Sequence, residues 1–328
     1  MSRPATGSLI AGFDAGQTHT TCRLAQLEPS GQWQVLSEGE GSGVSHLAAP
    51  GGEARFTEAL RSSLQAALQV PEAARALANG GALVAAAVGA SGIEQGSPVQ
   101  QRGQGLAAEA LALPPGCVAV TGDERTALRG ALGNRPGVLV ISGTGCIALG
   151  QNASGQQHRC GGWGWLLDGA GSAMDIGRDG LALSVRRADG RVPETALRAA
   201  LWQALNAATA QDVKAAVVAP GFGPAAFARL APLVAEAAEA GDREAAAVVQ
   251  RSALALADLV AGVSQALHLE APAVCAVGGA VEHLRPLRSG LESALAAQVP
   301  GARLEQPQGD ACDGALALAA GLPALSLG

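Results

Sequence analysis

The sequence predicts an α/β protein of two similar lobes, and three observations support this. The chain has 328 residues, and at roughly 150 residues per domain this length is typical of two domains. Short β-type apolar runs alternate with helical periodicity along the chain, as in α/β folds. A three-strand pattern with a Gly-and-Thr turn occurs near the start and again after residue 137, and such an internal repeat indicates two related lobes.

The first lobe is expected to open with a meander over residues 8–14, 20–27 and 32–38, because Gly- and Pro-containing turns separate these apolar runs. The elements expected after it are a helix over 53–68, a strand over 82–88, a helix over 105–113, a strand over 117–121 and a helix from 124 to 132.

The second lobe repeats the meander over 138–142, 146–150 and 156–160. The elements expected after it are helices over 194–208, 224–240 and 243–267, a strand over 273–277, a helix to about 297, a strand over 303–306 and a last helix over 313–321. The repeat places the lobe boundary near Gly122, giving lobes 1–122 and 123–328, with the last helix able to pack back on the first lobe.

Composition excludes several function classes. The net charge is −6 without a basic run, which argues against nucleic acid as a partner. The sequence holds no uninterrupted apolar run of 18 residues, and residues 1–7 contain no signal-peptide core, so we expect a cytoplasmic protein without a membrane partner. Six cysteines and five histidines are scattered, and their spacing predicts neither disulfides nor a transition-metal site.

Lys214 is the only lysine, so a phosphate-binding loop of the type GxxxxGK[ST] is impossible. Any phosphate site must use backbone amides, hydroxyl groups, arginine or a metal ion.

Two glycine turns are candidates for that role. Asp14 ends an expected strand and precedes a turn with Gly16 and Thr18, so Asp14 could hold hydrated Mg²⁺ while the turn faces phosphate oxygens. The second repeat has Gly143-Thr144-Gly145 at the matching place, and the two turns could grip a polyphosphate from both sides. Each could instead be an ordinary hairpin.

Asp123 lies at the end of a strand and directly before a helix. A carboxylate there could orient an acceptor hydroxyl and take its proton during phosphoryl transfer. It could also serve only as the N-cap of the helix.

The segment 161–172 is rich in glycine and contains Trp163, Trp165 and Asp168. Glycines beside Trp163 could present its indole to a sugar face, and Asp168 could accept hydroxyl hydrogen bonds; for Trp165 we expect core packing. Gly278-Gly279 follows an expected strand and would permit close approach of a base or ribose, or simply form a tight turn.

Taken together, these motifs resemble the N-acetylglucosamine kinase group of the BadF/BadG/BcrA/BcrD ATPase family. The resemblance rests on Asp-x-Gly-x-Thr at 14–18, Asp123, Ser-Gly-Thr-Gly at 142–145, Gly-Gly-Trp-Gly at 161–164 and the late Gly-Gly. It implies two ribonuclease-H-like (actin-like ATPase) lobes with a central cleft, and ATP with Mg²⁺ as cofactors.

The resemblance also implies roles for individual residues. By it Asp123 is the catalytic base, Asp14 serves Mg²⁺, and Thr18 and Thr144 meet the phosphates. Gly278 and Gly279 border adenosine. Ser91, Trp163 and Asp168 form the sugar pocket.

One departure concerns the segment after Trp165. The family pattern Gly-Asp-Glu-Gly-Ser is replaced by Asp168-Gly169-Ala170-Gly171-Ser172, so either Asp168 or Asp175 is the candidate for the sugar contact.

The function implied is phosphorylation of an amino sugar, with N-acetylglucosamine and its 6-phosphate favoured. Glucosamine is an alternative acceptor. Two other classes stay open: an activator ATPase of a radical dehydratase or benzoyl-CoA reductase, which would need clustered cysteines, and a sugar-responsive regulator without catalysis. A homodimer is expected by analogy with relatives.

Overall fold

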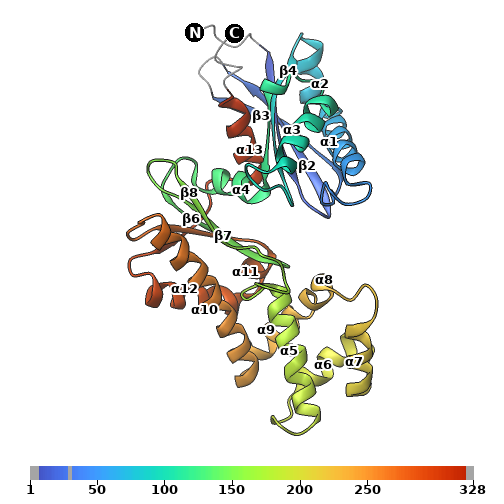
Figure 1. Cartoon of the computed structure of the whole chain (residues 1–328), viewed down its shortest axis with the longest axis vertical. Coiled ribbons are helices and arrows are strands. Elements are labelled where there is room, and N and C mark those ends of the chain that lie inside the picture. Colours follow the sequence, from blue (N-terminus) through green and yellow to red (C-terminus); the bar gives the residue numbers. More distant parts are fainter. Residues whose placement is uncertain (1–6, 29–31, 323–328) are drawn as a thin grey trace. The chain divides into compact units, whose positions relative to one another are not determined.

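The computed structural model describes residues 7–28 and 32–322. The chain forms two compact units, Met1–Asn134 with Pro307–Gly328 and Arg135–Gln306 (Figure 1). This division differs from the expected boundary at Gly122, because helix α4 (Asp123–Leu132) packs on α13 (Ala311–Ala320) and strand β4 (Ala82–Ala90) of the first unit. Each unit contains a five-stranded mixed sheet, which confirms the predicted α/β class.

The sheet of the first unit has the order β3-β2-β1-β4-β5. Strands β1 to β3 pair antiparallel, whereas β1, β4 and β5 run parallel. The other elements of this unit, with their bounds, are β1 (Ser8–Ala15), β2 (His19–Leu27), β3 (Trp33–Ser42), α1 (Gly52–Leu68), α2 (Pro71–Ala78), α3 (Pro98–Ala110), η1 (Pro115–Cys117) and β5 (Val118–Gly122).

Helices cover both faces of this sheet (Figure 1). Along β1, Leu9, Ala11 and Phe13 are buried in one core cluster with α1 and α3, whereas Ile10 is buried in another with Leu316 of α13. This alternation follows from the two-residue period of a strand. Strand β1 is therefore buried on both sides, which fits its almost continuous apolar sequence.

Glycines allow α13 to lie close to its neighbours. A Cβ atom on Gly12 would lie 2.6 Å from the carbonyl oxygen of Cys312. A Cβ atom on Gly130 of α4 would overlap the carbonyl oxygen of Asp310, and one on Gly314 would overlap that of Thr126. The contact between α4 and α13 is therefore a contact of backbones.

The second unit has the sheet order β10-β9-β6-β7-β8. Strands β6, β7 and β8 pair antiparallel, and β6, β9 and β10 run parallel. Its elements are β6 (Gly137–Ser142), β7 (Cys146–Gln151), β8 (Gln157–Gly161), α5 (Ala173–Ala188), α6 (Ala196–Ala204), α7 (Ala210–Val218), α8 (Pro224–Ala228), α9 (Ala231–Glu239), α10 (Arg243–Ala266), β9 (Ala273–Val277), α11 (Gly279–His283), α12 (Arg285–Gln298) and β10 (Arg303–Glu305).

Helix α10 is the centre of the second unit's core. Its buried residues include Val249, Leu256 and Val263, and they pack with β6, α9 and α12. Within the described residues, α10 is also the one helix long and apolar enough to span a membrane by length and composition. A core helix passes the same test.

The predicted strands agree with the structure to within a few residues, but several helices do not. Helices α2, α5 and α7 were not expected. The helix predicted over 224–240 is two helices, α8 and α9, and the single helix predicted up to about 297 is α11 and α12. Pro232 lies in the first turn of α9, where proline fits because its missing N–H has no partner in a first turn.

The contact between α4 and α13 generates a stability prediction. Gly314→Ala should lower the free energy of unfolding by about 1–3 kcal/mol, because the new methyl group would overlap the backbone of α4. In the control Gly105→Ala, the added Cβ on helix α3 has no atom within 4 Å, so this variant should gain about 0.5–1 kcal/mol. Urea unfolding of both variants measures the difference. Equal stabilities would contradict the close packing.

Candidate active site

Three parallel strands of the first unit end at the same level. Ala15 of β1 is paired with Ala90 of β4, and Ala90 is paired with Gly122 of β5. The residues that follow directly are Gly16, Ser91 and Asp123. The Ser91 amide donates a hydrogen bond to the carbonyl oxygen of Ala15 (3.1 Å). The sheet therefore brings three of the predicted site residues to one edge.

Asp14 precedes this edge by one residue in β1 and is partly buried. Burial, and to a smaller extent the carboxylates of Asp123 and Asp310, raise the pKa of its carboxyl group from 3.8 to about 6. Asp310 is the N-cap of α13 and binds the guanidinium group of Arg23. With Asp310 compensated by Arg23, Asp14 and Asp123 are carboxyl groups of this edge that could attract a cation.

Asp123 is the first residue of α4, and Gly122 occupies the N-cap position without a side-chain cap. The carboxylate Oδ1 of Asp123 accepts a hydrogen bond from the amide of Glu124 (2.9 Å). An N-cap side chain would bond the second or third amide of the helix instead. The N-cap alternative considered from the sequence is therefore wrong for Asp123.

Glu124 is a residue of this edge that the sequence analysis missed. Its side chain is largely buried, and its carboxylate lies against Gly122 so closely that a Cβ atom there would overlap it. Burial raises the pKa values of both Asp123 and Glu124. The sequence holds no signal for this, because a glutamate in a first helical turn is ordinarily exposed.

Backbone hydrogen bonds of Gly16 hold the turn between β1 and β2 in place. The Gly16 amide donates to the carbonyl oxygen of His19 (3.1 Å), and the Gly16 carbonyl accepts from Val44 (2.9 Å). Gly16 thus holds the turn in shape. Thr18 is exposed at its tip, where its hydroxyl group can reach a ligand.

The matching turn of the second unit, between β6 and β7, is also closed by a glycine amide but is one residue tighter. The Gly143 amide donates to the carbonyl oxygen of Gly145 (2.9 Å), and Thr144 is exposed. A Cβ atom added to Gly143 or Gly145 would have no atom within 4 Å. The two glycines therefore leave open space beside Thr144.

Gly278 lies against this same turn. It has φ of 102°, a conformation that favours glycine, and a Cβ atom on it would lie 2.6 Å from the carbonyl oxygen of Ser142. Gly279 begins α11 and has more room, with His283 as its nearest neighbour. The structure thus brings Gly278 and the Gly143–145 turn together at the ends of β9 and β6.

Hydrogen bonds tie the turn to the glycine-rich segment before α5. The Ser142 hydroxyl donates to the carbonyl oxygen of Gly171 (2.7 Å), and the Cys146 thiol donates to that of Ala170 (3.0 Å). The Ala173 amide, at the start of α5, donates to the carbonyl oxygen of Gly143 (2.8 Å). The Gly143–145 turn and this segment are therefore joined into one hydrogen-bonded structure.

Trp163 is 60% exposed, and the guanidinium carbon of Arg159 lies 4.6 Å from its ring centroid. This cation–π contact positions the indole on the surface of the unit. Trp165 is 36% exposed and lies 6.5 Å from the ring of Phe227. The expected core packing of Trp165 is therefore only partial.

Asp168 and Asp175 differ in what their carboxylates can do. Asp168 is partly buried; burial of the Cys146 thiol, and then the carboxylates of Asp168 and Asp175, raise the pKa of that thiol to about 12. Asp175 is buried, and its oxygens accept from Arg178 (2.5 Å), Ser252 (2.9 Å) and the Gly171 amide (3.2 Å). Asp175 thus stabilises the start of α5, and Asp168 is the better candidate for a ligand contact.

The described residues contain no group of three or more His, Cys, Asp or Glu side chains arranged to hold a metal ion. Mg²⁺ in phosphoryl-transfer sites commonly uses one or two carboxylates together with water and substrate phosphates. The donor set at the edge of the first unit, with Asp14 as its carboxylate, fits that kind of ion.

Known proteins provide a comparison. The sequence profile of the BadF/BadG/BcrA/BcrD ATPase family matches residues 11–319. An N-acetyl-D-glucosamine kinase of Dictyostelium discoideum is 33% identical over 199 residues, which cover 58% of this chain and 61% of that protein. The match thus spans less than two thirds of that relative.

Two further proteins are similar to the chain. An N-acetylmuramic acid/N-acetylglucosamine kinase of Clostridium acetobutylicum is 27% identical over 62% of this chain and 67% of its own length. A solved structure from Chromobacterium violaceum, provisionally named an N-acetylglucosamine kinase, has a TM-score of 0.71 and 28% identity over 95% of this chain and 98% of its own. These similarities confirm the predicted family and two-lobed fold.

The raised pKa of Asp14 gives a testable pH dependence. Because the folded chain binds this proton more tightly than the unfolded chain, the resulting stability is present below pH 3.8 and is lost as the pH rises through about 6. Asp14→Asn should therefore be more stable than the unmodified chain at pH 7.5, by roughly 1–3 kcal/mol, with little difference near pH 4.

Thermal unfolding at the two pH values tests this. Asp258→Asn, which removes an exposed carboxylate on α10, serves as the control and should show no such pH-dependent gain. If Asp14→Asn were less stable than the unmodified chain at pH 7.5, the raised pKa of Asp14 would be contradicted.

Proposed function

The chain belongs to the BadF/BadG/BcrA/BcrD ATPase family, and from that premise we propose that it is an ATP-dependent kinase of an amino sugar, phosphorylating N-acetylglucosamine to its 6-phosphate. The observation that carries the proposal is the level ending of β1, β4 and β5, which delivers Gly16, Ser91 and Asp123 to one edge. The names of the three similar proteins support the choice of substrate.

Asp123 is the proposed catalytic base. Its carboxylate would accept the proton of the sugar hydroxyl while the hydroxyl oxygen forms a bond to the γ-phosphorus of ATP. The bond from that phosphorus to the bridging oxygen then breaks, and ADP leaves. A pKa raised by burial suits this role, because a base works best when its pKa is nearer the working pH.

Both glycine turns are proposed to serve the polyphosphate. Thr18 and Thr144 are exposed at the tips of their turns, so their hydroxyl groups are available as donors to phosphate oxygens. Gly16, Gly143 and Gly145 would keep the turns free of side chains. Gly278 and Gly279 would border the adenosine, where glycine permits close approach.

Mg²⁺ would supply the charge neutralisation that no lysine can provide, since Lys214 lies on α7. Asp14 is the residue proposed to hold it, through water. A cation bound beside Asp14 would lower the pKa that burial and the neighbouring carboxylates raise, so the side chain would be ionised in the working state.

The sugar is proposed to contact Ser91, Trp163 and Asp168. The exposed indole of Trp163 offers an apolar face suited to a pyranose ring, and Asp168 offers acceptors for hydroxyl groups. Arg159, stacked on Trp163, fixes the ring that would receive the sugar.

The role of Asp123 is tested by Asp123→Asn. We expect kcat to fall by about 100-fold or more, with ATP affinity nearly unchanged because Asp123 acts on the acceptor. Nucleotide binding by calorimetry and a coupled assay of ADP release give the two values, with Asp258→Asn as the control. Retention of most of the activity would remove Asp123 from catalysis.

The substrate is tested by kcat/KM for N-acetylglucosamine, glucosamine, N-acetylmannosamine, N-acetylmuramic acid and glucose. Loss of a polar contact can cost about 10⁴-fold, whereas loss of an apolar methyl contact costs about 10-fold to 100-fold. Amino sugars should therefore differ more from glucose than acylated sugars differ from one another. Glucose as the best acceptor would overturn the amino-sugar assignment, and no ADP release with any sugar would overturn the kinase.

A further inference from the structure

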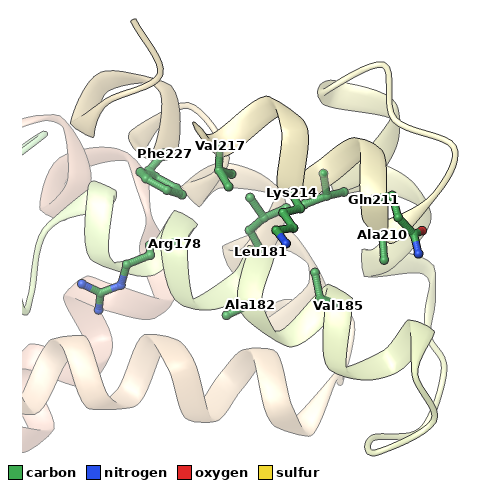
Figure 2. A pocket seen from close by; sticks show the side chains of 10 residues that line it. Arg178, Leu181, Ala182, Val185, Ala210, Gln211, Lys214, Val217 and Phe227 are labelled. Carbon is green, nitrogen blue, oxygen red and sulfur yellow. The ribbon is translucent and has the colours of Figure 1, made fainter. Parts of the chain in front are cut away.

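A pocket of about 560 Å³ lies in the second unit between α5 and α7 (Figure 2). Phe227 of α8 lies at one end, near Arg178, and Val185 and Ala210 lie at the other. The volume is within the range of small-molecule sites, about 300–1,000 Å³. None of the residues proposed for phosphoryl transfer lines this pocket.

The pocket exists because α7 packs loosely. Val213 is the only buried residue of α7. Along α5 the lining residues are Arg178, Leu181, Ala182 and Val185, which are spaced as one face of a helix over two turns. Ala210, Val213, Lys214 and Val217 of α7 have the same spacing. Two apolar stripes therefore face each other across a slot about 10 Å long.

Lys214, the only lysine of the chain, lies over this slot (Figure 2). Among the residues that the structure describes, it has neither a hydrogen-bond nor an ion-pair partner. The acidic residues of α5 and α7 have other partners: Asp212 closes the capping box of α7, and Asp175 and Asp179 of α5 bind Arg178. An uncompensated positive charge thus borders an apolar slot.

We propose that this slot binds an unbranched amphipathic carboxylate, with its alkyl chain between α5 and α7 and its carboxylate beside Lys214. The two facing stripes favour a narrow, linear apolar body. The ammonium group of Lys214 favours a ligand with an anionic end. The lining is otherwise apolar apart from two further polar residues, Arg178 and Gln211. This site does not depend on the proposed kinase activity.

Phe227 connects the slot with the glycine-rich segment. Its ring lines the pocket and also lies 6.5 Å from the ring of Trp165. Filling the slot should therefore change the surroundings of Trp165, and tryptophan fluorescence offers a second readout besides direct binding.

The experiment is calorimetric titration of the full chain with hexanoate, octanoate, decanoate and dodecanoate, each below its micelle concentration. We expect one site per chain, with Kd falling about fourfold for each added methylene group until the slot is full. The 1-alkanol of equal length should bind about two- to fivefold more weakly, because an exposed ion pair contributes modestly. Lys214→Gln should abolish that difference, and Lys214→Arg should keep it.

Ala182→Phe places a ring inside the slot and should abolish binding. Ala215→Phe places the same ring on the exposed outer side of α7 and should leave binding unchanged; circular dichroism and Tm establish that both variants are folded. The proposal fails if no carboxylate binds saturably, if the alkanol binds as tightly as the carboxylate, or if folded Ala182→Phe still binds. It also fails if Ala182→Phe changes the oligomeric state, which would show a protein partner in the slot.

Discussion

The candidate site depends on the hydrogen-bond register of β1, β4 and β5. Because Ala15, Ala90 and Gly122 are paired across these strands, the next residues all emerge at one edge, although more than 100 positions separate Gly16 from Asp123. A slip of one residue in β4 would move Ser91 to the other face of the sheet. The same register keeps Asp14 half-enclosed beside Asp123, which is the physical origin of its raised pKa.

In the second unit, hydrogen bonds link the predicted nucleotide and sugar elements directly. The end of β6 contacts Gly278 and is bonded to Gly171 and Ala173 through Ser142 and Gly143. A displacement of the Gly143–145 turn would therefore act first on residues 170–173, at the end of the segment that bears Trp163. This arrangement would let one ligand influence the binding of the other without a separate relay.

The fold could be predicted from the sequence wherever the spacing of apolar residues was regular. Strands such as β1 and β6 alternate faces or run apolar between turn residues, so their limits were found to within a few residues. Helix α5 was not predicted because its start lies in a glycine-rich run. Ser172 caps this helix by accepting a hydrogen bond from the Asp175 amide, which becomes evident only in the structure. The sequence could not distinguish a helix-cap role of Asp123 from a role as catalytic base. The burial of Glu124 and the slot beside Lys214 depend on tertiary packing, which no local pattern encodes.

The discontinuous first unit also determines the order in which the chain can fold during synthesis. Helix α13 is translated after the whole of residues 135–306, yet it covers the face of the first sheet that holds Ile10, Ala85 and Ala87. Until α13 has been synthesised, that apolar face lacks its covering helix, whereas the second unit is a single continuous range that is synthesised before α13. Nascent chains paused before residue 311 should therefore depend most on chaperones, since exposed sheet faces promote aggregation.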